Sequence, residues 1–231
     1  MMETFPVIDK VRKEGRFILT EFESKKILKQ IGIPVVETKL AKTQKEAVSF
    51  SQKIGFPVAL KIISPDVIHK TDSGGVKLGL KNVSEVREAY HEILEAVRKQ
   101  YPDAIIHGVS VQKMVRPGTE VIIGTSKDPQ FGPVIMFGLG GIFVEILKDV
   151  SFRIVPVNRK DAQEMTEEIK GYALLRGYRG KEPANIPALV EIILRVSNFI
   201  HENPQIKELE LNPVFAYEDR ALAVDARIIL E

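Results

Sequence analysis

The chain has 231 residues, of which 33 are Lys or Arg and 31 are Asp or Glu, so its formal net charge is only +2. It contains no Cys, no Trp and four His, and 44% of its residues are hydrophobic. The near-neutral balance argues against a protein that binds duplex nucleic acid through a broad basic surface. Without Cys, this chain has no disulfide framework, thiolate metal site, iron–sulfur cluster or Cys nucleophile. Covalent or metal chemistry must therefore use His, Ser, Lys or carboxylates.

The sequence predicts neither a secreted nor a membrane protein. The N-terminal residues MMETFPVIDKVRKEG lack the apolar core and the small-residue cleavage site of a secretory signal. Apolar runs such as Val134 to Phe137 fall far short of the roughly 18–20 residues that span a bilayer. We therefore expect a cytoplasmic protein that binds neither membrane nor nucleic acid. The absence of Cys beside abundant charged residues is typical of a thermophile.

The first hundred residues alternate helical and extended patterns. Two capping boxes, at 20–23 and 43–46, each start a helix that ends at a glycine. Each of these helices is followed by an apolar run that is typical of a strand. The predicted elements are a helix at 20–32, a strand at 33–41, a helix at 43–55, strands at 56–63 and 76–80, and a helix at about 84–99.

After Pro102 the pattern changes to consecutive strands with turn residues between them, which is typical of an antiparallel meander. Helices and antiparallel strands in two lobes indicate an α+β fold. We therefore divide the chain into an N-terminal extension at 1–19, a first lobe at 20–107 and a second lobe at 108–231. The predicted elements here are strands at 107–115, 119–128, 131–141 and 151–157, helices at 158–169 and 186–201, and strands at 206–217 and 221–230.

A lysine lies in the middle of the apolar strand VALKII. Lys61 is costly at such a position unless its charge is paired or bound to an anion. Two interpretations follow from this. Either the stem is covered while the ammonium group reaches solvent, or the ammonium group binds an anion.

The long polar loop at 64–75 joins two apolar strands and carries His69. Loops of this length are usually functional or disordered. Lys70 follows the histidine directly, and Gly74-Gly75 can turn backbone N–H groups toward an anion. A neutral imidazole is nucleophilic at physiological pH, so His69 is a candidate acceptor of a transferred phosphoryl group. A solvated histidine in a charged loop is the alternative.

The strand ELELNPV carries a polar face, on which Glu210 and Asn212 alternate with leucines of the opposite face. The turn at 218–220 brings Asp225 of the next strand beside Asn212. Carboxylate and amide oxygens on adjacent strands suit a Mg²⁺ ion that is shared with nucleotide phosphates. A solvated acidic strand face is the alternative, although Asp225 lies in an apolar run.

A third candidate is the extended segment Gln112-Lys113-Met114-Val115, which Glu120 follows. Backbone amide and carbonyl groups of such a segment can contact a purine edge, and a carboxylate a few residues on can bind a ribose. The glycine-rich run at 137–141 lacks the spacing of a P-loop.

Three stretches resemble the ATP-grasp fold, and more closely the nucleotide-binding β subunit of ADP-forming acetyl-CoA synthetase. They are FPVALKIISPDVIHKTDSGGVKLGL, DPQFGPVIMFGLGGIFVEILKDVSFRIVP, and ELELNPVFAY with AVDAR. The resemblance covers essentially the whole chain. The family that it indicates is related to succinyl-CoA synthetase. It implies a two-lobed ATP-grasp fold that binds its substrate, ADP or ATP, between the lobes together with Mg²⁺.

The resemblance also implies an acid–CoA ligase reaction. Acyl-CoA, phosphate and ADP are converted reversibly into the free acid, CoA and ATP. A partner α subunit, in an α2β2 assembly, binds CoA and is phosphorylated on its own histidine. The chain studied here is then expected to take that phosphoryl group onto His69 and to deliver it to ADP.

Other residues gain roles from the same resemblance. Many ATP-grasp enzymes carry Glu-x-Asn on the last metal strand, whereas here Asp225 is followed at that spacing by Arg227. The number of metal ligands therefore stays open. By position, the resemblance assigns the nucleotide phosphates to Lys61, the adenine to Gln112, Lys113, Met114 and Val115, the ribose to Glu120, and the metal to Asn212 and Asp225, with Glu210 in a supporting place.

Two other functions stay open. A carboxylate ligase of the same fold that makes acyl phosphate directly from ATP has no need of His69. A nucleotide-sensing regulatory module binds ADP without forming an acid-labile phosphoprotein.

Overall fold

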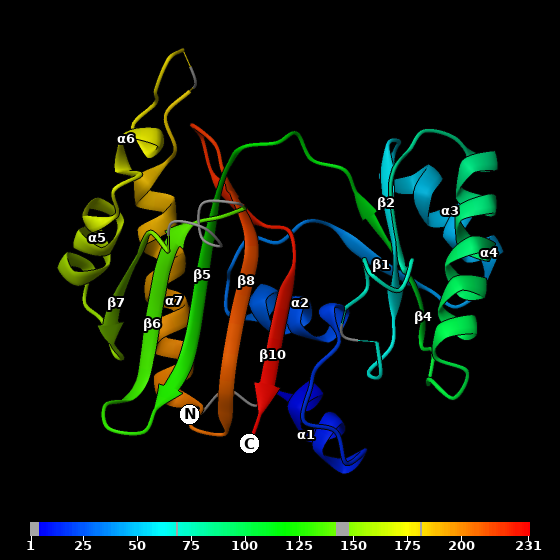
Figure 1. Ribbon diagram of the computed structural model, residues 1–231, viewed down its shortest axis with the longest axis horizontal. Coiled ribbons are helices and arrows are strands. Elements are labelled where there is room, and N and C mark those ends of the chain that lie inside the picture. Colours follow the sequence, from blue (N-terminus) through cyan, green and yellow to red (C-terminus); the bar gives the residue numbers. More distant parts are fainter. Residues whose placement is uncertain (1–4, 68, 142–147, 181) are drawn as a thin grey trace. The chain divides into compact units, whose positions relative to one another are not determined.

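The structure is a computed structural model that describes residues 5–67, 69–141, 148–180 and 182–231. The described residues form two compact units (Figure 1). Unit 1 comprises residues up to 19, residues 23–35 and residues 117–231, and unit 2 comprises residues 20–22 and 36–116. Each unit combines helices with an antiparallel sheet, which confirms the predicted α+β class.

Unit 2 is a four-stranded antiparallel sheet covered by two helices. Thr43 caps the first helix through the predicted capping box with Glu46, and Asn82 caps the second. Apolar residues of the sheet and of both helices form one buried core. The strand order is β1 (Thr38–Ala41), β4 (Gly108–Lys113), β2 (Val58–Ile63) and β3 (Val76–Leu80), and the helices are α3 (Gln44–Ile54) and α4 (Val83–Gln100).

The strand β4 corrects the expected boundary between the lobes. We expected residues from 108 onward to join the second lobe, but β4 pairs with β1 and β2 in unit 2. The division of the chain therefore falls between Arg116 and Pro117 instead of after His107. A hydrophobic pattern shows that a strand is buried, but it does not show which strand is its partner.

Unit 1 is built on a six-stranded antiparallel sheet. Its strands β5, β6 and β7 form the predicted meander, and α7 and α5 pack against β6 and β7 (Figure 1). The strand order is β10 (Ala226–Leu230), β8 (Ile206–Ala216), β5 (Thr119–Asp128), β6 (Gly132–Leu139) and β7 (Val150–Ile154), with β9 (Ala221–Ala223) paired to β8. The helices are α1 (Pro6–Lys13), α2 (Glu21–Gln30), of which Glu21 and Phe22 belong to unit 2, α5 (Arg159–Glu168), α6 (Tyr172–Leu175) and α7 (Ile186–Glu202).

The expected N-terminal extension contains a helix that packs into unit 1. Ile8 and Val11 of α1 are buried, and the Phe5 ring lies edge-on to the Phe199 ring with centroids 5.1 Å apart. Segment 1–19 therefore contributes to the core as far as it is described. Among the described residues, no helix has the length and hydrophobicity that are needed to cross a membrane.

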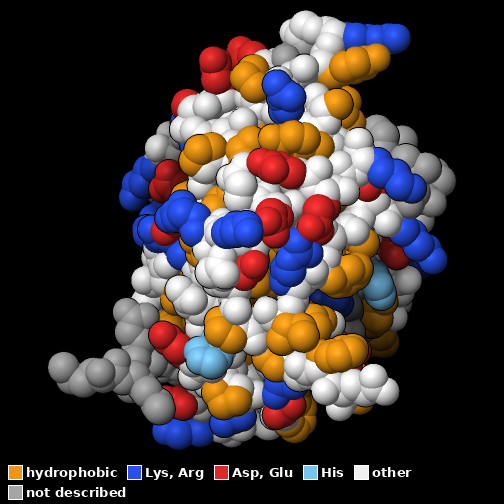
Figure 2. Space-filling model, turned by 90° about the vertical axis from the view of Figure 1, so that its left-hand side faces the viewer, with side chains coloured by type: hydrophobic (Ala, Val, Ile, Leu, Met, Phe, Trp, Pro, Cys, Tyr) orange, Lys and Arg blue, Asp and Glu red, His pale blue; other side chains and the backbone are white. Residues whose placement is uncertain are grey.

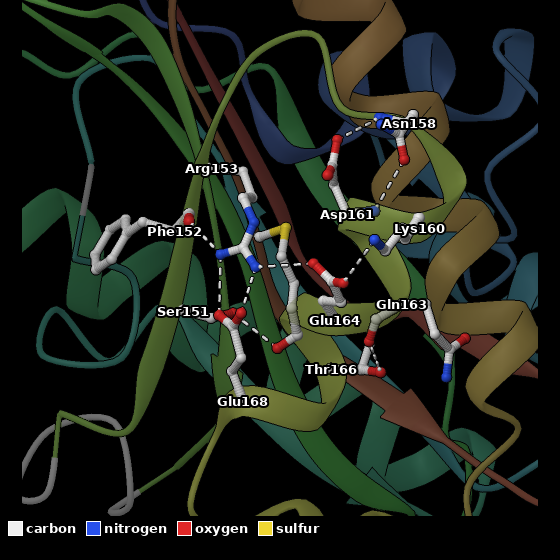
Figure 3. A network of polar contacts seen from close by, with 11 residues as sticks. Ser151, Phe152, Arg153, Asn158, Lys160, Asp161, Gln163, Glu164, Thr166 and Glu168 are labelled. Carbon is white, nitrogen blue, oxygen red and sulfur yellow. Dashed lines mark hydrogen bonds and ion pairs between the residues drawn. The ribbon is translucent and has the colours of Figure 1, made fainter.

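A network of polar contacts connects the edge strand β7 to α5 (Figure 3). Arg153 of β7 donates Nη1 to Glu168 Oε2 at 2.9 Å, and its Nη2 contacts the other oxygen of the same carboxylate. Two residues earlier on the same strand, Ser151 Oγ donates to the Met165 carbonyl at 2.8 Å. The side of the molecule on which α5 lies has Lys and Arg interspersed with Asp and Glu (Figure 2).

Hydrogen bonds from Arg153 lower the pKa of Glu168 below its ordinary value. A carboxylate with a lowered folded-state pKa adds stability above its unfolded-state pKa, and this stability is lost as the pH falls through the folded-state pKa. Glu168→Gln should therefore lower the free energy of unfolding by about 0.5–1 kcal/mol at neutral pH, since the pair is partly exposed. Urea unfolding at neutral pH and at about pH 3 measures this, and the deficit should be smaller at the lower pH, because the pH has fallen below the ordinary Glu pKa toward the lowered folded-state pKa.

Glu167→Gln on the same helix is the matched control, since Glu167 lacks an arginine partner among the described ion pairs. Its substitution should change stability by less than about 0.5 kcal/mol at either pH. An equal deficit for Glu168→Gln at both pH values would contradict the assigned pair.

Candidate functional site

The ammonium group of Lys61 is buried within unit 2. Every residue of β2 is buried, and the Lys61 side chain as a whole is only 9% exposed. Lys61 Nζ donates to Glu21 Oε1 at 3.1 Å. The sequence therefore correctly indicated a lysine that needs a partner, although it did not identify the carboxylate.

Glu21 holds a second lysine as well. Its side chain is fully buried, and its other oxygen, Oε2, accepts from Lys70 Nζ at 2.7 Å. We call these three residues the Glu21 cluster. Glu21 was predicted only as a residue of a helix-starting motif, and an acidic residue in a first helical turn is ordinarily explained by the helix dipole. No sequence signal linked it to a lysine 40 or 49 residues away.

His69 is exposed, and the loop around it is folded into short turns. The His69 carbonyl accepts from Ser73 N at 3.2 Å, and the Lys70 carbonyl accepts from Gly75 N at 2.7 Å. Gly75 has no room for a side chain, since a Cβ would lie 2.6 Å from Ile62 Cγ2. Because the amides of Gly74 and Gly75 are donated within the turn, they do not form the anion nest that we expected. The positive charge adjacent to His69 in the chain is that of Lys70.

The predicted adenine-binding segment lies at the end of β4 in unit 2. Gln112 is buried, Lys113 is exposed, and Met114 and Val115 are half-buried. Lys113 N donates to the Glu37 carbonyl at 3.2 Å, and Met114 N donates to the Pro57 carbonyl at 3.1 Å. A purine contact at these two residues would therefore use their carbonyl oxygens.

Glu120 lies in unit 1, on β5, and its side chain is exposed. Its carbonyl accepts from Gly140 N at 2.8 Å. A Cβ on Gly141, which has a φ of +61°, would lie 3.1 Å from Glu120 Oε2. The glycines after β6 thus leave space for the Glu120 carboxylate, a relation that the sequence did not reveal.

The predicted metal ligands lie close together in unit 1, with Glu210 and Asn212 on β8 and Asp225 between β9 and β10. Asn212 N donates to the Asp225 carbonyl at 3.3 Å, which confirms the predicted neighbourhood of these two residues. Asn212 Nδ2 donates to Glu210 Oε1 at 3.1 Å, and Arg227 Nη2 donates to Glu210 Oε2 at 2.9 Å. Asp225 is half-buried, and its Oδ1 accepts from Ala226 N at 2.8 Å.

This donor set limits the kind of metal site that is possible. Within the described part of the chain, no three His, Cys, Asp or Glu side chains are grouped so that they could hold a metal by themselves. Two carboxylates and an amide nevertheless fit Mg²⁺, which typically takes one or two carboxylates and completes its shell with water and phosphate oxygens. Arg227 pairs with Glu210 at 2.9 Å and offsets the charge of that carboxylate.

Comparison with known proteins identifies the family of this chain. A family model of the ATP-grasp domain matches residues 10–230. Subunit β of acetate–CoA ligase [ADP-forming] I from Pyrococcus furiosus is 55% identical over 224 residues, which cover 97% of this chain and 96% of that protein. The chain belongs to the ATP-grasp family of ADP-forming acetate–CoA ligase β subunits. This confirms the family and the fold that the sequence predicted.

Solved structures of acetyl-coenzyme A synthetase 1 from Ca. Korarchaeum cryptofilum share the fold of this β-subunit family member. One, in complex with coenzyme A, Ca-AMPCP and HgCl⁺, matches with a TM-score of 0.96 and 49% identity, covering 99% of this chain and 100% of that one. Another holds coenzyme A and Mg-AMPPCP, and its phosphohistidine segment points towards the nucleotide binding site. It matches with a TM-score of 0.87 and 47% identity, covering 98% and 99%.

Lys61→Met in this ATP-grasp chain should lower the free energy of unfolding by about 3 kcal/mol, because removing one partner of a buried ion pair leaves the other charge poorly compensated. Urea unfolding measures the change. Lys77→Met is the control, since Lys77 on β3 of the same sheet forms an exposed ion pair with Glu92 of α4. It should cost less than about 1 kcal/mol. Equal losses for the two variants would contradict a stabilising role for the Glu21 cluster.

Proposed function

We propose that this chain receives a phosphoryl group from a partner α subunit onto His69 and transfers it to ADP, as the β subunit of an ADP-forming acyl-CoA synthetase. The observation that carries the proposal is an exposed histidine joined to Lys70, whose ammonium shares a buried carboxylate with Lys61. In the overall reversible reaction, acyl-CoA, phosphate and ADP give the free acid, CoA and ATP.

The two phosphoryl transfers balance as simple displacements. An imidazole nitrogen of His69 attacks the phosphorus of the α-subunit phosphohistidine, so that one N–P bond forms while another breaks. A terminal oxygen of ADP then attacks the same phosphorus, which forms a P–O bond and frees the imidazole. Such transfers depend mainly on positioning and on cations that offset phosphate charge. Lys70, next to His69 in the chain, and Lys61 supply two cations that share the Glu21 carboxylate in unit 2.

Further residues bind the nucleotide in this proposal. Lys61 contacts its phosphates, the segment Gln112–Val115 contacts the adenine, and Glu120 contacts the ribose. Asn212 and Asp225 hold a Mg²⁺ ion, with Glu210 in support. When bound, Mg²⁺ neutralises charge on the phosphate oxygens. Support comes from the donor chemistry of these residues and from the nucleotide analogues, with Ca²⁺ or Mg²⁺, in the Korarchaeum complexes.

The partner in this proposal is an α subunit that binds CoA and carries its own phosphohistidine, in an α2β2 assembly. Support comes from the Pyrococcus relative, which is named as a subunit β. The Korarchaeum complexes contain coenzyme A, and one has a phosphohistidine segment directed at the nucleotide binding site. Selection of the acyl group falls to the α subunit.

Incubation with Mg²⁺ and ATP labelled in its γ-phosphate is expected to give an acid-labile, base-stable phosphoprotein. His69→Ala should abolish this label, because the accepting nitrogen is gone. His91→Ala is the matched control, since His91 is an exposed histidine on α4 of the same unit. It should keep the full label. Label retained by His69→Ala, or full turnover of that variant with the α subunit, would overturn the phosphoryl relay.

Asp225→Ala and Asn212→Ala should each slow Mg²⁺-dependent phosphorylation by on the order of tenfold or more, since each removes an oxygen donor for the metal. Binding of ADP without Mg²⁺, measured by calorimetry, should change far less. A variant that loses both properties equally would indicate a folding defect instead of a metal site.

A further inference from the structure

We infer that Glu21 is a positioning residue for phosphoryl transfer, because its carboxylate fixes both the Lys61 ammonium and the turn that presents His69. This inference rests on the proposed role of His69. It concerns a residue that touches no phosphoryl group itself and acts through two lysines.

The geometry of Glu21 is that of a bridge between segments. One carboxylate oxygen accepts from Lys61 on β2, and the other accepts from Lys70 in the loop after β2. The Glu21 side chain is fully buried, whereas those of Lys61 and Lys70 are 9% and 20% exposed. Because each oxygen serves a different lysine, neutralising or shortening the side chain affects both ammonium groups.

Lys70 connects the bridge to His69. Its carbonyl accepts from Gly75 N at 2.7 Å and from Ser73 Oγ at 2.9 Å, so the backbone of the turn is closed around this residue. Its side chain is held by Glu21 at 2.7 Å. His69 is therefore bonded to Lys70, a residue whose backbone and side chain are both held by hydrogen bonds. Loss of the bridge frees the side-chain end, and the imidazole then samples a wider range of positions.

The stability of the fold alone does not explain why Glu21, Lys61 and Lys70 are charged. Burying three charged groups is costly, and well-packed apolar side chains usually stabilise a fold at least as well. A bridging carboxylate instead keeps two ammonium groups beside each other in the absence of phosphate. Misplacement of a reacting group by about 1 Å can slow a reaction on the order of a hundredfold, so fixing these groups is a direct route to rate.

Glu21→Gln keeps the size of the side chain and removes its charge, whereas Glu21→Asp keeps the charge and shortens the reach. Glu23→Gln is the matched control, because Glu23 lies two residues along the same helix, is 10% exposed and pairs with Arg16 at 2.8 Å. Two quantities are measured for each variant. One is the rate of phosphohistidine formation at saturating Mg-ATP, and the other is the rate at which an amine-reactive reagent labels Lys70, relative to exposed Lys53.

Glu21→Gln should slow phosphohistidine formation by on the order of tenfold or more at saturating nucleotide. It should also speed the labelling of Lys70, and Glu21→Asp should fall between it and the wild type. Glu23→Gln should match the wild type in both measurements, even if it lowers the unfolding midpoint. An unchanged phosphorylation rate in folded Glu21→Gln, or equal slowing by Glu23→Gln, would overturn the inference.

Two results separate this inference from the proposed function. If the wild-type chain forms no phosphohistidine, the role of His69 fails and the positioning role fails with it. If the wild type is phosphorylated and Glu21→Gln is phosphorylated equally fast, only the positioning role fails. If Glu21→Gln does not fold, the phosphorylation rate of Glu21→Asp and the labelling of wild-type Lys70 test the inference instead. Labelling of wild-type Lys70 as fast as that of Lys53 would overturn the bridge.

Discussion

Two lysines share one buried carboxylate in unit 2, and the chemistry proposed for this chain depends on that arrangement. Lys61 lies on a strand whose every residue is buried, and Glu21 is fully buried beside it. Taking such groups out of water costs on the order of several kcal/mol per ion, so each charge persists only at contact with an opposite one. The benefit is a cation held where water is scarce, because an interaction with phosphate is stronger there than at an exposed surface.

The two units carry complementary chemistry. Unit 2 contains His69 and the two lysines, and unit 1 contains the oxygen donors Glu210, Asn212 and Asp225. A phosphoryl group in transfer needs cations around its oxygens and a nucleophile in line with the leaving group, and it makes little demand for unusual side chains. In the proposed function, a chain without Cys therefore performs covalent chemistry through one histidine. Arg227, which departs from the wider ATP-grasp pattern, offsets the charge of Glu210 through an ion pair at 2.9 Å.

Sequence patterns correctly predicted structural features that depend on residues close together in the chain. The capping box at Thr43 forms as expected, since it involves residues three positions apart. Alternation along β8 correctly placed the polar side chains on one face. Features that depend on distant segments were not predicted. The pairing of β4 with β1 and β2 is one, and the contact of Glu21 with Lys61 is another, because neither hydrophobic period nor motif encodes which remote partner a residue meets.

The most direct test follows the phosphoryl group itself. The chain is phosphorylated with labelled ATP, freed of nucleotide, and mixed with ADP and Mg²⁺ in a single turnover. The account predicts that the label leaves His69 and appears as ATP, one molecule for each phosphohistidine lost. Label that stays on the protein, or that is released as inorganic phosphate without ATP, would contradict it.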